Sequence, residues 1–117
     1  MKKITRHCLF TLLLFLAACS SKPVVTQPDD LIAEDTIVQM LAEQLLIEST
    51  IFNAPSNYDK DELTRAYYSQ LFEKYNVTVP RYRSSLTYYF TDKERMNNIL
   101  TKAKEQIDAQ SATLPNQ

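Results

Sequence analysis

The chain has 117 residues, 13 basic and 14 acidic side chains, a net charge of −1, no glycine and no tryptophan. A length of this order suits one small domain. The lack of glycine excludes a glycine-rich phosphate loop, and the balanced charge argues against a basic surface for nucleic acid.

The N-terminal residues predict an export signal. The first six residues contain three positive charges, the stretch 8–16 is almost wholly apolar, and Leu-Ala-Ala precedes Cys19. The apolar run is too short to span a hydrocarbon core of about 30 Å as a helix, and small residues at its end are typical of a cleavage site. We therefore interpret residues 1–18 as a cleaved signal peptide. The sequence around Cys19 resembles the lipobox of bacterial lipoproteins, and this resemblance implies lipidation of Cys19.

Cleavage before Cys19 would remove residues on which many catalytic sites depend. His7 is the only histidine, and Cys8 is the only cysteine besides Cys19. The remaining chain then excludes a disulfide, a Cys/His zinc site and a histidine-dependent nucleophile. It holds ten basic and 14 acidic residues, a net charge of about −4. We expect no cofactor, no nucleic-acid partner and no enzymatic activity, with a carboxylate-dependent enzyme as the alternative.

Residues 19–28 predict the lipidated cysteine and a flexible tether. Pro23 and Pro28 occur without any apolar periodicity, which favours extended backbone. At about 3.1 Å per residue, the stretch 20–28 reaches roughly 28 Å. Such a tether would lift the domain clear of the lipid headgroups.

Residues 29–111 predict a small all-α domain of four helices, and residues 112–117 predict a frayed tail. The first helix is expected over 33–52, with Asp29 or Asp30 as its start signal. It is one long N-terminal helix, and the three helices after it have short connections.

The later helices carry clear boundary signals. The second is expected over 60–75, where Asp59 and Glu62 form a capping box and Asn76 stands where a helix end favours positive φ. Thr78 predicts the start of the third helix. Thr91 with Glu94 is a second capping box, which predicts the start of the fourth helix.

The helix over 33–52 is apolar on two sides. One apolar line contains Val38, Leu41, Leu45 and Phe52, and a second line contains Met40, Ile47 and Ile51. Because a contiguous exposed apolar patch usually marks an interface, we predict that the second line is an interaction surface. Tyr88 falls nearly opposite the apolar face of its own helix, and we predict that it adds an exposed aromatic contact to that surface.

Glu48 lies on the apolar side of the first helix. A buried carboxylate without partners would be costly, so we predict a polar contact from Arg83 or from a tyrosine hydroxyl, which would fix the register of the helices. The alternative is that Glu48 acts as a general acid or base. Seven tyrosines occur between residues 58 and 89, and they predict either core packing or a binding surface.

An ordered series of residues carries a family resemblance. The stretch 67–78, which begins Tyr-Tyr-Ser-Gln-Leu-Phe, is followed by Tyr82, Ser85-Leu86 and Tyr88-Tyr89. This series, with the stretches 32–35 and 45–48, resembles the small Bacteroidetes lipoproteins of the domain of unknown function 4296 family. Asn76 stands where that family usually has glycine. The resemblance implies no activity and no site residues. Some related lipoproteins reach the cell surface through paired acids after the lipidated cysteine, and residues 20–23 lack them.

We therefore predict a lipid-anchored, non-catalytic interaction or assembly-accessory module of the cell envelope, on the periplasmic face of the outer membrane. Its expected partners are the membrane, through the lipid, and either an envelope protein or a second copy of the chain. A weaker similarity to helical segments of parvulin-type periplasmic chaperones leaves a chaperone-like role as an alternative. A cell-wall-binding domain is a further alternative.

Overall fold

The computed structural model describes residues 24–113 of the chain. Within this range it contains four α-helices and no strand, which confirms the all-α prediction: α2 (Glu34–Asn53), α3 (Lys60–Tyr75), α4 (Val79–Tyr89) and α5 (Lys93–Thr113). The predicted signal peptide 1–18, Cys19, the stretch 20–23 and residues 114–117 lie outside the described residues.

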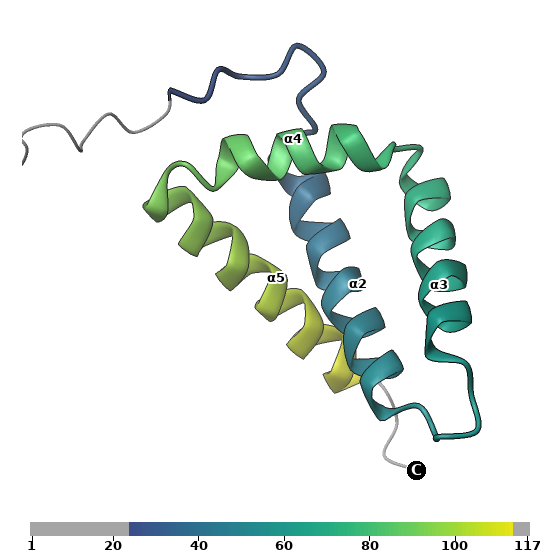
Figure 1. Ribbon diagram of the computed structural model, residues 1–117. Coiled ribbons are helices and arrows are strands. Elements are labelled where there is room, and N and C mark those ends of the chain that lie inside the picture. The colour runs from purple at the N-terminus through teal and green to yellow at the C-terminus, as the bar shows by residue number, and fades with distance from the viewer. Residues whose placement is uncertain (1–23, 114–117) are drawn as a thin grey trace, which may run out of the picture.

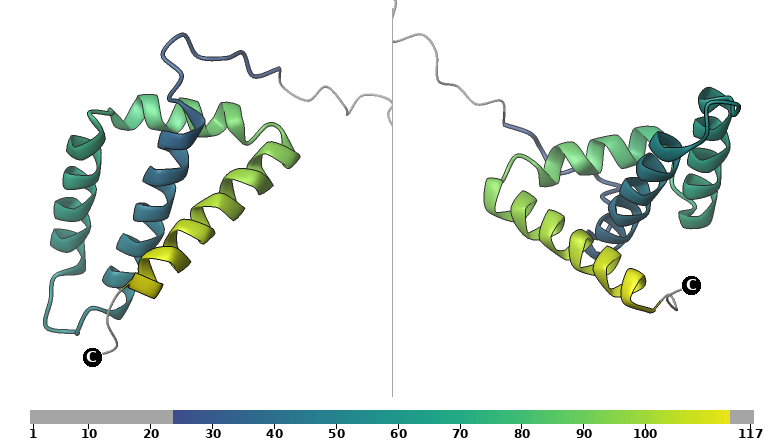
Figure 2. Two further views of the ribbon diagram at one scale, coloured as in Figure 1. Left: turned by 180° about the vertical axis from the view of Figure 1, so that it is seen from behind. Right: turned by 90° about the horizontal axis from the view of Figure 1, so that it is seen from below.

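Helix α2 is the element that the other three share. It contacts α5, α3 and α4, and Figure 1 shows it between α3 on one side and α5 on the other, with α4 across its N-terminal end. The views from behind and from below agree with this arrangement (Figure 2). The four helices therefore form one layer of three helices that is closed at one end by α4, rather than a symmetric bundle.

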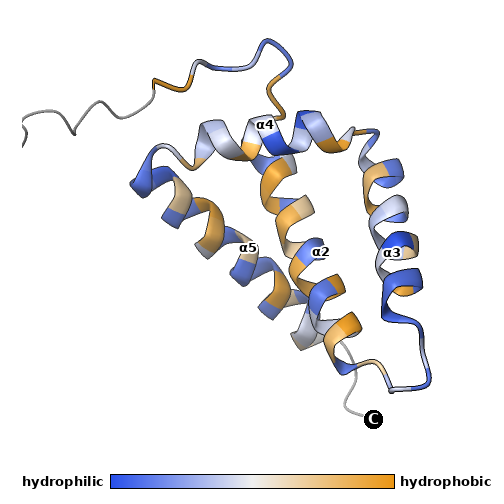
Figure 3. Ribbon diagram, in the orientation of Figure 1, coloured by the Kyte–Doolittle hydropathy of each residue, from blue (hydrophilic) through white to orange (hydrophobic). Residues whose placement is uncertain are grey.

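The hydrophobic core follows from this arrangement, because apolar residues on α2 meet apolar residues of all its neighbours. Ile37 and Met40 on α2 and Ile99 on α5 are completely buried. Figure 3 shows that apolar residues are most continuous along α2 and more dispersed on the other helices. The buried core contains Ile32, Ile37, Val38, Met40, Leu41, Ala42, Leu71, Val77, Tyr82, Tyr89, Ile99 and Ala103.

Three predicted boundary signals are confirmed. The Asp59 carboxylate accepts hydrogen bonds from the backbone N–H groups of Asp61 and Glu62 at the start of α3. Asn76 ends α3 in the left-handed conformation, with φ 50° and ψ 47°, which suits a short polar side chain in the absence of glycine. The Thr78 hydroxyl accepts from the Arg81 N–H at 3.4 Å and begins α4.

Other boundaries differ from the sequence prediction. Helix α5 is capped by Asp92, which accepts from the N–H groups of Glu94 and Arg95. The Thr91 hydroxyl instead donates to the Tyr88 carbonyl at the end of α4, so the capping role passes to the next residue. Helix α2 begins without a side-chain cap, and α5 continues through the first two residues of the predicted frayed tail.

The prediction of an exposed apolar surface on α2 is wrong. Met40 is 0% exposed and Ile51 is 9% exposed, and Ile47 is half-buried against the core. In the other predicted line, Leu45 is 44% exposed and Phe52 is 80% exposed.

Two glutamates explain why the second line is covered. Glu43 and Glu48 both accept hydrogen bonds from tyrosines of α3. At 100° per residue, Met40, Ile47 and Ile51 project between these two glutamates. The second apolar line therefore faces α3.

Candidate functional site

Four tyrosines recur at intervals of seven residues along α3 and α4, and we call them the tyrosine row. Their hydroxyls all donate to acceptors between residues 32 and 48. Tyr68 donates to Glu48, Tyr75 to Glu43 at 2.7 Å, Tyr82 to Gln44 at 2.9 Å, and Tyr89 to the Ile32 carbonyl at 2.7 Å. The hydroxyls thus connect α3 and α4 to α2 and the segment before it. The sequence analysis did not single out this spacing of seven, which is the sequence signal for the role.

The surroundings of the tyrosine row raise the pKa values of its hydroxyls. Burial, followed by the hydrogen bond to Glu48, raises the pKa of Tyr68 to about 12. Burial raises the pKa of Tyr82 to about 12 as well. Tyr75 also has a raised pKa, because of burial and then its hydrogen bond to Glu43. These side chains therefore remain protonated donors at neutral pH.

The structure separates Glu48 from the predicted partner Arg83. Glu48 is exposed and accepts from the Tyr68 hydroxyl, so the tyrosine alternative of the prediction is the one observed. Arg83 is exposed on α4 and has no ion pair within residues 24–113. The predicted Glu48–Arg83 contact is absent. Glu48 is bound by Tyr68 of α3, whereas Arg83 lies on α4.

Residues 27–32 pack along α4, and we call them the N-terminal strap. The Ile32 N–H donates to the buried Ser85 hydroxyl at 3.1 Å, and the Ile32 carbonyl accepts from Tyr89. Arg81 donates to the Asp30 carbonyl at 2.7 Å. The Ser-Leu and Tyr-Tyr pairs that carry the family resemblance therefore hold the backbone that enters α2.

Tyr88 belongs to the same contact rather than to a free surface. It is half-buried, its ring lies edge-on to Tyr89 at 5.7 Å, and its hydroxyl donates to the Gln27 side chain at 3.2 Å. The prediction of an exposed Tyr88 is therefore wrong. Gln27 and Pro28, at the end of the predicted tether, therefore take part in ordered contacts: the Gln27 side chain accepts from Tyr88, and the Pro28 carbonyl accepts from the Leu31 N–H. The contact between Gln27 and Tyr88 joins residues that are 61 positions apart in the sequence.

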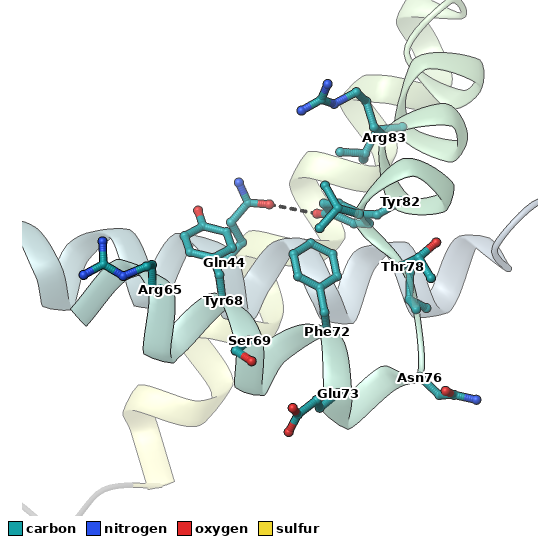
Figure 4. Close-up of a pocket in the computed structure, with 13 residues that line it drawn as sticks. Gln44, Arg65, Tyr68, Ser69, Phe72, Glu73, Asn76, Thr78, Tyr82 and Arg83 are labelled. Atoms are coloured by element: carbon teal, nitrogen blue, oxygen red, sulfur yellow. Dashed lines mark hydrogen bonds between the residues drawn. The ribbon is translucent and has the colours of Figure 1, made fainter. Parts of the chain in front are cut away.

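A groove of about 890 Å³ lies between α3 and α4, with Gln44 of α2 at its base. Figure 4 shows Tyr68 and Phe72 from α3 and Tyr82 from α4 along it. The Phe72 ring stacks near Tyr68 at 6.4 Å and meets Tyr82 edge-on at 5.6 Å. The groove lining is mainly apolar, and aromatic rings supply much of it. Sequence reasoning did not find this groove.

Two arginines border the groove. Arg65 from α3 and Arg83 from α4 both line it, both are exposed, and neither forms an ion pair within the described part of the chain. Glu73 also lines the groove, toward the Asn76 end of α3 (Figure 4). An apolar floor with two unpaired guanidinium groups at its border is suited to a ligand that is apolar and carries negative charge.

Between residues 24 and 113, no group of three or more His, Cys, Asp or Glu side chains is arranged to hold a metal ion. None of the helices in that range is long and apolar enough to cross a membrane.

Comparison with known families identifies the domain. The family model described as Domain of unknown function (DUF4296) matches residues 28–113. The match covers more than half of the chain, so the chain belongs to this family, as its sequence series predicted. The matched range begins at Pro28 and therefore includes most of the N-terminal strap. No curated protein and no solved structure matches the chain.

Proposed function

We propose that this member of the DUF4296 family is a lipid-anchored, non-catalytic interaction module of the cell envelope. In this proposal the groove between α3 and α4 binds an apolar, acidic segment of another envelope protein. The observation that carries the proposal is the groove itself, which combines Phe72 and two tyrosines with two unpaired arginines.

The chemistry of the groove supports a protein ligand. Aromatic side chains and arginine supply a large share of binding energy at protein interfaces, because they offer a large rigid contact area and directional hydrogen bonds. Arg65 and Arg83 border the groove from different helices. An acidic residue of the ligand could therefore pair with each of them while its apolar residues cover Phe72.

The sequence supports the anchored, non-catalytic part of the proposal. The lipobox-like residues before Cys19 supply an attachment point. His7 and Cys8 precede that point, so a processed chain would lack the side chains of the common nucleophilic sites. We place the anchored chain on the periplasmic face of the outer membrane, because residues 20–23 lack the paired acids of surface-exported lipoproteins.

Site-specific photocrosslinking in intact cells tests the groove. Ser69 is exposed and lines the groove, whereas Lys104 is an exposed position on α5. A photoreactive residue at position 69 should give a discrete crosslinked product whose captured peptide is apolar and acidic. The same residue at position 104 should not give that product.

Charge reversal sharpens this test. The double variant Arg65→Glu/Arg83→Glu should greatly reduce the product from position 69, because the acidic ligand would meet like charge. Lys93→Glu/Lys104→Glu reverses the same number of exposed charges on α5 and should leave the product unchanged. Equal products from positions 69 and 104, or no loss in the arginine variant, would overturn the groove as the binding site. A captured peptide from the chain itself would identify the ligand as a second copy.

A further inference from the structure

We infer that α4 is the membrane-facing surface of the domain and that the loop between α2 and α3 is the surface farthest from the membrane. This inference rests on the lipid anchor at Cys19 that the proposed function includes. It goes beyond that function because it fixes which side of the molecule a partner can reach.

The N-terminal strap is the first observation. Its contacts with α4 begin at the Gln27 side chain, continue through the Asp30 carbonyl and end at both backbone groups of Ile32. The two bonds at Ile32 are buried, and Ser85 is 0% exposed. The chain that leads to the anchor therefore leaves the domain along α4 and not from the start of α2.

The remaining connection is short. Only eight residue steps separate Cys19 from Gln27. At most about 3.5 Å per residue, this connection spans no more than about 28 Å when fully extended. A connection that ran freely from Cys19 to the start of α2 would be almost twice as long.

The length of α2 sets the scale for comparison. Its 20 residues extend over about 30 Å at 1.5 Å per residue. Figure 1 shows α4 at the N-terminal end of α2 and the loop to α3 at the opposite end. An inverted domain, with the loop on the membrane, would need the connection to be fully stretched. The strap therefore disfavours inversion and keeps α4 close to the membrane surface.

The position of the groove gives this orientation a consequence. Val79 and Arg83 line both the groove and a smaller depression of about 450 Å³ between α4 and residues 25–28. The α4 side of the groove thus adjoins the exit of the anchor. In this orientation the α4 side of the groove faces the membrane, so a membrane-proximal segment of another protein can reach it from that side.

Depth-dependent fluorescence quenching tests the orientation. The processed, lipidated protein, which begins at Cys19, is reconstituted into phosphatidylethanolamine/phosphatidylglycerol vesicles that contain a headgroup-linked quencher. Because the thiol of Cys19 carries the lipid, a fluorophore can be attached to one introduced cysteine, either Thr87→Cys on α4 or Asn57→Cys in the loop. Both positions are exposed. We expect quenching to be several-fold stronger at position 87 than at position 57.

Release of the strap by mutation tests whether the strap sets the orientation, and Arg65→Ala is the matched control. Arg81→Ala/Tyr88→Phe removes the two solvent-exposed contacts that hold residues 27–30 and keeps the buried contacts at Ile32. The connection then lengthens beyond the length of α2, so the difference in quenching between positions 87 and 57 should shrink. Arg65→Ala, which touches no strap residue, should preserve the difference.

The outcomes distinguish the two proposals. If the lipidated protein does not float with the vesicles, whereas a positive-control lipoprotein does, the anchor fails and the orientation fails with it. If the protein floats but positions 57 and 87 are quenched equally, or position 57 more strongly, the orientation alone is overturned. A difference that survives release of the strap would show that the strap does not set the orientation.

Discussion

The two halves of α2 carry similar apolar sequences, but the first half is buried more completely than the second. In the first half, Ile37 and Met40 are 0% exposed and Ala42 is 1% exposed. In the second half, Ile51 is still buried, at 9% exposed, but Leu45 is 44% exposed and Phe52 is 80% exposed. The difference arises because α4 and the N-terminal strap close only the first end of α2 (Figure 1). Burial here depends on which elements reach a residue and not on its own apolar character.

The largest effect is expected when one apolar residue in each half is truncated. Met40→Ala should lower the free energy of unfolding by about 2–5 kcal/mol, because it removes buried contacts and leaves a cavity. Leu45→Ala should lower it by less than about 1 kcal/mol, because much of that side chain is already solvated. Urea denaturation followed by circular dichroism measures both. Equal losses in the two variants would show that the halves of α2 are equally packed.

The second test concerns the contact between the strap and α4. Ser85→Ala should cost about 1–3 kcal/mol, because the Ile32 N–H would remain buried without its acceptor. Ser84→Ala is the matched control, since the Ser84 hydroxyl donates to the Arg81 carbonyl of its own helix. Hydrogen exchange at the Ile32 amide should accelerate in the first variant only. If it stays slow there, another group accepts the Ile32 hydrogen bond.

The sequence predicted the helices well because their boundary signals are local. Asp59, Asn76 and Thr78 act within four residues of their own position, so no knowledge of the fold is required. The predicted cap of α5, Thr91, is one residue away from the observed cap, Asp92. The Thr91 hydroxyl is not available as a cap because it donates to the Tyr88 carbonyl at the end of α4.

The sequence did not predict which line of α2 is exposed, the strap or the groove. Each of these depends on partners far away in the chain. Ile32 meets Ser85 across 53 residues and Tyr89 across 57 residues. Local composition around Pro28 is typical of a free linker, and only the tertiary contact with α4 changes that interpretation. The spacing of seven in the tyrosine row was the one local signal for these long-range contacts.

A third test compares the two candidate caps of α5. Asp92→Ala should lower the free energy of unfolding by about 0.5–2 kcal/mol, because two N–H groups of the first turn would lose their acceptor. Thr91→Ala should have a smaller effect, because its hydroxyl bonds to an exposed carbonyl. Thermal and urea denaturation measure both variants. A larger loss of stability for Thr91→Ala would show that Thr91 is the cap, as the sequence predicted.

The smallest effect is expected at the outer end of the tyrosine row. Tyr68 donates to Glu48, which is exposed. Tyr68→Phe should therefore cost less than about 1 kcal/mol at pH 7, because water can replace the lost donor. The buried hydroxyl of Tyr89 at the strap end has no such replacement, so Tyr89→Phe should cost more. Similar losses from both variants would contradict the difference between the two ends of α2.

Alkaline pH separates the contribution of Tyr68 further. Its pKa is about 12 in the folded protein, compared with about 10 in an unfolded chain. The unfolded chain therefore releases this proton first as the pH rises. The stabilisation is fully present below about pH 10 and is lost as the pH approaches 12. Urea unfolding at pH 9, 10 and 11 should show little change between pH 9 and 10 and a decrease in stability above pH 10, and this decrease should be shallower in Tyr68→Phe. The decrease in stability that remains in Tyr68→Phe should come in part from Tyr82, whose pKa is also raised to about 12. If the free energy of unfolding falls equally with pH in wild type and in Tyr68→Phe, the Tyr68 hydroxyl is solvated in the folded protein. The stabilising part of the tyrosine row would then begin at Tyr75.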